Sequence, residues 1–222
     1  MQPSVRVRLL AGGLTPPLFV AVLVVLTVAE RRFLHRVGWS AVHRTRVEWP
    51  SLLALGRYGW VMVATFLIGG IFGLALASAM WSAAVGDGER VVAALVALMS
   101  VAIALESFRP DSPQATGAAS WHDTVHNDVF PAIPIASLAA ATVAVYVARR
   151  VARPYLGLAA GAALLCSMVI GLGLTSVDSI AQLARYVYFG ALLVWIELVA
   201  LGTLARSREA SAELRPPTRR RS

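Results

Sequence analysis

The sequence predicts an all-α fold: a polytopic membrane protein with six transmembrane helices in one bundle. Of its 222 residues, 58% are hydrophobic and only 14% are charged, whereas a soluble domain carries about a quarter charged residues. The apolar residues gather in segments close to the roughly 20 residues that a helix needs to cross a bilayer. The net charge of +8 is better explained by orientation in a membrane than by nucleic acid, which we do not expect as a partner.

Six segments have the length and composition of transmembrane helices. The first follows Arg6 and Arg8 as a signal peptide would, but it is longer than a signal core and contains Pro16 and Pro17, so we expect it to be retained. The third is the shortest, and aromatic rings near the ends of several others are typical of the membrane interface. The predicted spans are Leu10–Ala29, Tyr58–Trp81, Arg90–Glu106, Val129–Ala148, Pro154–Leu174 and Leu183–Leu204.

The arginines predict the orientation and the cell. Most of them flank the spans on the side that holds both termini, so we expect the N- and C-termini in the cytoplasm. Residues 1–204 then form the membrane domain, and residues 205–222 form a basic, disordered cytoplasmic tail. Every basic residue is Arg and none is Lys, which indicates GC-rich codons and a bacterial plasma membrane.

The first outer loop, Glu30–Arg57, is the exception because it is rich in arginine although it is predicted to be external. One interpretation places it along the membrane surface, with Leu34 and Trp39 among the lipid headgroups.

Glycine pairs four residues apart indicate where helices approach each other closely. Gly69 and Gly73 form such a pair in the second span, and Gly157 and Gly161 form one in the fifth. These Gly-rich faces could also pair the chain with a second copy or another membrane protein. Membrane lipids are the other expected partners.

The predicted outer face collects most of the chemistry, above all in the segment W-H-D-T-V-H. On a helix, His122 and His126 lie on one face, as two ligands of one metal ion must. Asp111 could fold back as a third ligand, and the set would suit zinc with one position open for water. Asp111 or Asp123 would then handle the proton of that water. The alternative is a polar loop whose histidines cap the next helix and bind water.

One acid, Glu197, lies inside a predicted span. An ionised carboxylate at that depth is costly, so it indicates either a functional group with a partner or a protonated side chain that bonds a neighbouring helix. Arg90, at the inner end of the third span, is the candidate partner.

Three segments together resemble a bacterial family of unknown function, domain-of-unknown-function family 998. They are R-V-E-W-P-S-L-L-A-L-G-R-Y-G-W in the first outer loop, then F-R-P-D, then W-H-D-T-V-H. The sequence departs from the family pattern where Arg109 precedes Pro110 and where Asp123 replaces an expected Gly. The resemblance implies six spans and an important outer loop, but no reaction. The matching positions would be Ser51, Gly56, Phe108, Asp111, His122 and His126.

A looser similarity is to the membrane hydrolases that include alkaline ceramidases and adiponectin-receptor-like proteins. It implies that Ser51, Asp111 and the two histidines would surround zinc at one end of the bundle. The functional hypothesis is therefore a metal-dependent hydrolase of a lipid or lipid-linked substrate, with Ser51, Asp111 and Asp123 as catalytic candidates. The alternative is a non-enzymatic small transporter or an accessory subunit of a membrane complex.

Overall fold

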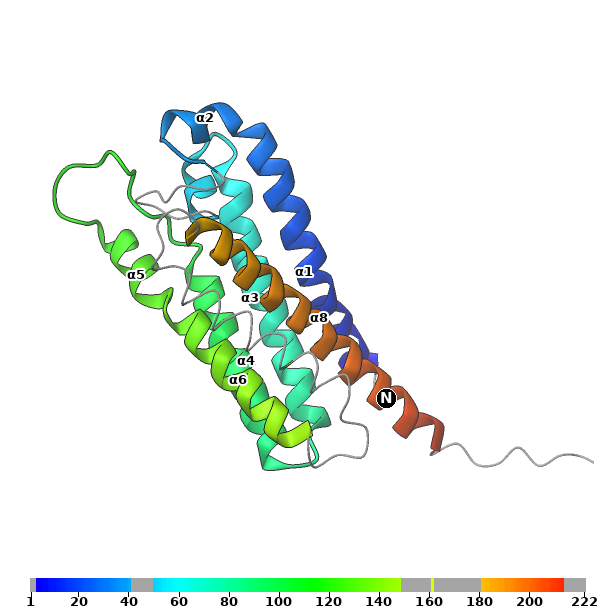
Figure 1. The fold of residues 1–222 in the computed structure, drawn as a ribbon. Helices are drawn as coiled ribbons and strands as arrows, with labels where there is room; N and C mark the ends of the chain where they lie inside the picture. The colour runs from blue at the N-terminus through cyan, green and yellow to red at the C-terminus, as the bar shows by residue number, and fades with distance from the viewer. Residues whose placement is uncertain (1–2, 41–49, 149–160, 162–180, 214–222) are drawn as a thin grey trace, which may run out of the picture.

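The computed structural model describes residues 3–40, 50–148, 161 and 181–213, which are all helix and loop without a strand. The long helices lie side by side, with the short helix α2 and the loop before α5 at one end (Figure 1). The elements are α1 (Pro3–Ala29), α2 (Arg31–Arg36), the 3-10 helix η1 (Ser51–Leu55), α3 (Gly59–Ala83), α4 (Asp87–Leu105), α5 (Trp121–Val129), α6 (Ala132–Ala148) and α8 (Ala181–Glu213).

Within the described residues, five helices are long and apolar enough to cross a membrane. They correspond to the first four predicted spans and the last, so the protein is a multi-pass membrane protein. The predicted span Pro154–Leu174 lies outside the described residues. The candidate spans of the structure are Val5–Ala29, Gly59–Ala83, Asp87–Leu105, Trp121–Val147 and Tyr186–Ala205.

Two helices extend well beyond the predicted spans. Helix α1 begins at Pro3 and continues through Pro16 and Pro17, because neighbouring helices can satisfy the backbone groups that a proline frees in a membrane. Helix α8 continues past Leu204 to Glu213, so the first part of the predicted tail is helical. Residues 214–222 lie outside the described part of the chain.

Glycines bring α3 against α4, though not with the predicted pairing. A Cβ on Gly70 would lie 2.5 Å from the Cβ of Ala104 and 2.7 Å from the carbonyl oxygen of Ser100, and one on Gly73 would overlap Ser100. Gly69 faces α1, where its Cβ would meet Thr15 at 3.6 Å. The α3 glycines therefore serve contacts within the chain, and pairing with another chain stays a prediction.

The described parts of the first predicted outer loop, residues 30–40 and 50–57, pack on the end of the helices, so the interpretation that places Leu34 among lipid headgroups does not hold. Leu34 is only 1% exposed and belongs to the same core cluster as Leu52 and Leu53, with Trp39 packed against it. The buried Glu30, just after α1, accepts a hydrogen bond of 2.6 Å from the backbone N–H of Tyr58. This hydrogen bond joins the end of α1 to the start of α3. It thereby helps to hold η1, which directly precedes α3, in place.

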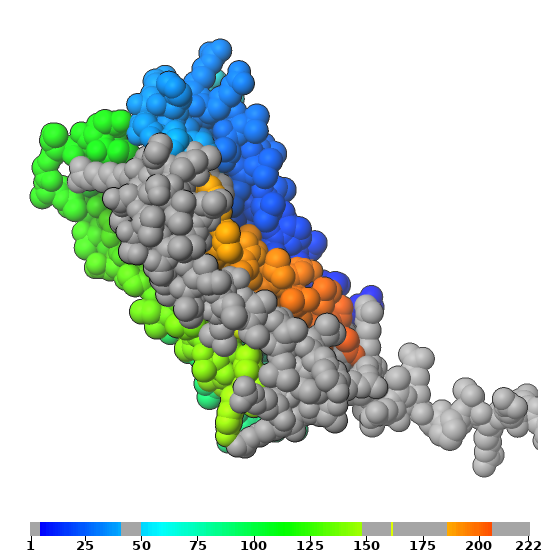
Figure 2. All heavy atoms as spheres, in the orientation of Figure 1, coloured from blue at the N-terminus to red at the C-terminus, as the bar shows by residue number. Residues whose placement is uncertain are grey.

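The end that carries α2, η1 and α5 lies away from the start of α1 and the described end of α8 (Figure 1). In the space-filling view, α2 in blue and the loop before α5 in green project at this same end (Figure 2). The described candidate residues of the predicted outer loops lie at this end.

Candidate functional site

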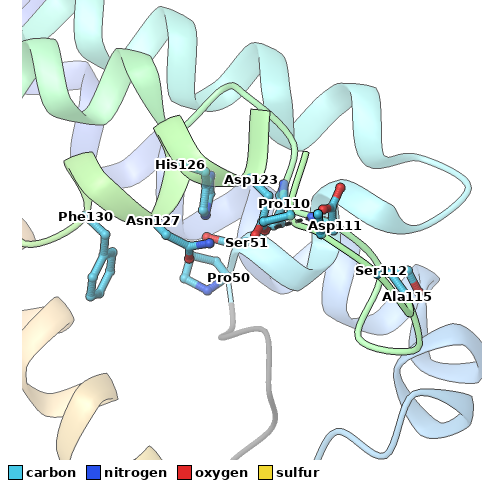
Figure 3. A pocket seen from close by; sticks show the side chains of 13 residues that line it. Pro50, Ser51, Pro110, Asp111, Ser112, Ala115, Asp123, His126, Asn127 and Phe130 are labelled. Atoms are coloured by element: carbon cyan, nitrogen blue, oxygen red, sulfur yellow. Dashed lines mark hydrogen bonds between the residues drawn. The ribbon is translucent and has the colours of Figure 1, made fainter. Parts of the chain in front are cut away.

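A polar pocket of about 310 Å³ lies between η1, the loop after α4 and helix α5 (Figure 3). Its walls come from segments far apart in the sequence, since Pro50 and Ser51 lie before α3 and the other described lining residues lie between α4 and α6. The polar side chains that line it belong to Ser51, Asp111, Ser112, Asp123, His126 and Asn127.

Asp111 and Asp123 shape the loop that forms one wall of this pocket. The backbone N–H of Asp111 donates to Oδ1 of Asp123 at 2.9 Å, and Oδ2 of Asp111 accepts from the N–H of Ser120 at 2.8 Å. Ser120 caps α5, because its hydroxyl accepts from the N–H of Asp123 at 3.2 Å. Between Asp111 and Ser120 the loop turns at Gly117, whose φ of +125° favours glycine. These two carboxylates, predicted to handle protons, therefore hold the loop against α5.

Beneath the pocket, one buried carboxylate joins two other elements. Glu106 ends α4, is 2% exposed, and its Oε2 lies 3.0 Å from Nε2 of His126, which is 4% exposed. The hydroxyl of Ser51 donates to the same Oε2 at 3.4 Å. Helices α4, α5 and η1 thus meet at a single carboxylate oxygen.

The hydrogen bonds of His126 limit its protonation. Its Nδ1 lies 2.8 Å from the carbonyl oxygen of Phe108, and a carbonyl oxygen can only accept, so Nδ1 carries a hydrogen. The bond at Nε2 then joins either an imidazolium to a carboxylate or a neutral imidazole to a protonated Glu106. In both arrangements the pair shares one proton that can move between Glu106 and His126.

The predicted zinc ligands His122, His126 and Asp111 do not form a metal site in the described residues, where no cluster of three potential ligands occurs. His122 is exposed and stacks on Trp121, with ring centroids 3.7 Å apart, and it does not line the pocket. His122 lies one helical turn before His126, which places it about 5.4 Å away along the axis of α5. Only His126 therefore reaches Glu106. Both ring nitrogens of His126 already have partners in the protein. His43 of the first predicted outer loop, another candidate ligand, lies outside the described residues.

The predicted pairing of Glu197 with Arg90 is wrong. Arg90 instead pairs with Asp87 at the start of α4, with 3.2 Å between Nη1 and Oδ1. Glu197 is half-buried and faces α1, where a Cβ on Gly13 would lie 3.9 Å from its Oε1. Its Oε2 has no hydrogen-bond partner in the part of the chain that the structure describes.

Glu106 is the residue that the sequence analysis did not place in the site. Its signal is an acid at the last turn of an apolar span, just before the loop with the histidines. Ser51 and His126 were both candidates, but their proposed roles did not involve Glu106.

The helices and the pocket define a multi-pass membrane protein with a buried acid–histidine pair under a polar pocket. The chain belongs to the family described as "Protein of unknown function (DUF998)", whose model matches residues 19–204. This match confirms the resemblance seen in the sequence and includes every residue of the pocket. No curated protein matches the chain, and no solved structure does.

Proposed function

We propose that this protein is a membrane hydrolase that cleaves an ester or amide bond of a lipid or lipid-linked substrate in the pocket on its outer face. Ser51 would be the nucleophile, Glu106 the base that takes its proton, and His126 the group that orients Glu106. The observation that carries the proposal is the meeting of Ser51 and His126 at one oxygen of a buried Glu106, directly under the pocket.

The burial of this group favours a functional role over a purely structural one. A buried ion pair contributes little to stability compared with apolar side chains of similar volume, because its desolvation is costly. Glu106, His126 and Ser51 are nevertheless all buried. Titratable groups held this way beside a cavity are candidates for catalysis, and the pocket volume of about 310 Å³ lies within the range of ligand sites.

The chemistry would follow a two-step path. Ser51 Oγ would attack the substrate carbonyl while its proton passes to Glu106, and that proton would then go to the leaving group. The imidazolium of His126 would keep the carboxylate in position and offset its charge. Water would release the acyl group from Ser51 in the second step, again with Glu106 as the base.

A second candidate function is a non-enzymatic binding subunit. The contact between Ser51 Oγ and Glu106 Oε2, at 3.4 Å, is longer than the usual range of about 2.5–3.0 Å for hydrogen bonds between oxygens. This length favours a structural role, in which the contact between Glu106 and His126 only holds α4 against α5.

Hydrolysis of a p-nitrophenyl acyl ester by the purified protein in detergent separates these functions. We expect the wild type to release p-nitrophenol and Ser51→Ala to lose at least about 100-fold in rate, while Glu106→Gln loses a similar factor because it removes the base. Ser112→Ala is the matched control, since this exposed serine lines the same pocket and its hydroxyl donates to Oε1 of Gln114 rather than to Glu106. Equal rates for Ser51→Ala and the wild type would favour the binding subunit.

A further inference from the structure

Helix α2 separates its apolar and its basic side chains onto opposite faces. The basic side chains fall within about 140° of the helix circumference, since each residue turns the helix by about 100°. All of them are exposed: Arg31, Arg32, His35 and Arg36. Phe33 and Leu34 point to the other side, where they pack in the core cluster under η1. The three arginines therefore form a surface, the Arg face of α2, that the described fold leaves open.

The Arg face has no counter-ion among the described residues. None of its three guanidinium groups forms an ion pair with an acid there. The neighbouring acid, Glu30, is buried, and its Oε1 accepts from the backbone N–H of Tyr58 instead. Exposed charges of one sign repel each other and attract anions from outside the protein.

The length of α1 places the Arg face at the level of the lipid head groups. The candidate span Val5–Ala29 has 25 residues, which is about 37 Å of helix, whereas the hydrocarbon core is about 30 Å thick. When the span is centred in the bilayer, both of its ends reach beyond the hydrocarbon. Helix α2 begins directly after this span, at Arg31, and projects at the end of the molecule (Figure 2).

Anionic phospholipids present the matching chemistry at this level. Their phosphate oxygens accept hydrogen bonds from a guanidinium group, often two in parallel. Basic residues next to a membrane span attract such lipids. A zwitterionic lipid also has a phosphate, but its ammonium group is repelled by the arginines. These arginines lie in the loop predicted to be external, where the orientation of the chain does not account for them.

We infer that the Arg face of α2 binds the phosphate head groups of anionic phospholipids in the leaflet at this end of the helices. The apolar face of α2 holds the helix on the protein, and the arginines hold it to the membrane surface. The inference goes beyond the proposed hydrolase and does not depend on it, since head-group binding requires neither Ser51 nor Glu106.

Native mass spectrometry of the purified protein in a neutral detergent tests this inference by measuring bound lipid. The protein is titrated with phosphatidylglycerol or with phosphatidylcholine of the same acyl chains. We expect the wild type to bind phosphatidylglycerol several-fold more tightly. The triple variant Arg31→Gln/Arg32→Gln/Arg36→Gln should lose most of this preference while it still folds, because the three side chains are exposed. Equal binding of both lipids by the wild type would overturn the inference.

A triple variant of the C-terminal segment separates the Arg face from the net charge of the chain. Arg219→Gln/Arg220→Gln/Arg221→Gln removes the same number of charges and should keep the preference for phosphatidylglycerol. If this variant loses as much preference as the α2 variant, or if the α2 variant keeps it, the assignment to α2 is wrong. Arg32→Glu, which reverses one exposed charge, repeats the test if the triple α2 variant does not fold.

Free glycerol phosphate distinguishes a lipid surface from a site for soluble phosphates. It carries the same phosphate group but is not held in the micelle beside α2. An amount equal to that of phosphatidylglycerol should therefore leave lipid binding unchanged. Displacement of the lipid by this equal amount would indicate a soluble-phosphate site and would overturn the inference of a membrane contact.

Discussion

Glu106→Ala should destabilise the protein by about 3–5 kcal/mol, because it removes one partner of a buried pair and leaves the other unpaired. His126 is 4% exposed and would lose its contact at Nε2, and Ser51 would lose its acceptor. Thermal unfolding in detergent measures the loss. The double variant Glu106→Leu/His126→Leu should recover much of it, because it removes both charges and refills the space with apolar atoms.

These two variants separate stability from function. If the pair exists for its chemistry, the double variant unfolds near the wild-type temperature but lacks ester hydrolysis. A double variant that is less stable than Glu106→Ala alone would show that the pair is a structural clamp.

Gly59→Ala should destabilise the protein by about 3 kcal/mol, the upper end for a side chain forced into a packed site. Gly59 begins α3, and a Cβ there would overlap the carbonyl oxygen of Ala54 in η1. The obstacle is backbone, so η1 must move, and Ser51 moves with it. We therefore expect lower thermal stability together with lost ester hydrolysis.

Gly190→Ala is the matched control for this substitution. Gly190 lies inside α8, and a Cβ there would meet no atom of the described residues within 4 Å. Alanine is a better helix former than glycine, so this variant should be at least as stable as the wild type. A Gly59→Ala protein with the stability and activity of Gly190→Ala would contradict the close contact between η1 and α3.

The five described membrane helices were predictable because hydrocarbon thickness imposes a length on each apolar segment. The start of α3 and the end of α4 fall within a residue of the predicted span ends, and the resemblance in the outer loops was confirmed by the family match. The positions of the glycines in space were less predictable. A spacing of four pointed to Gly69 and Gly73. Gly73 does lie against α4, but its companion there is Gly70, because the rotation of α3 turns Gly69 toward α1.

The site itself was predictable only in part. His122 and His126 do share a helix, as their spacing predicted. The spacing does not show which of the two side chains is buried against another helix. The pairing of His126 with Glu106 depends on how the loop returns over the end of α4, which Asp111, Asp123 and Gly117 determine. Ser51 joins them because η1 is packed in the core and Glu30 fastens the first loop to the start of α3. Such contacts between distant segments leave no periodic signal in the sequence.

Covalent labelling with a fluorophosphonate tests the central claim, that Ser51 is an activated nucleophile under the pocket, most directly. The purified protein in detergent would be treated with the probe, digested and analysed by peptide mass spectrometry. The account predicts one phosphonate adduct on Ser51, much reduced in Glu106→Gln and absent in Ser51→Ala. A folded wild-type protein without an adduct on Ser51, or one labelled equally in Glu106→Gln, would contradict it.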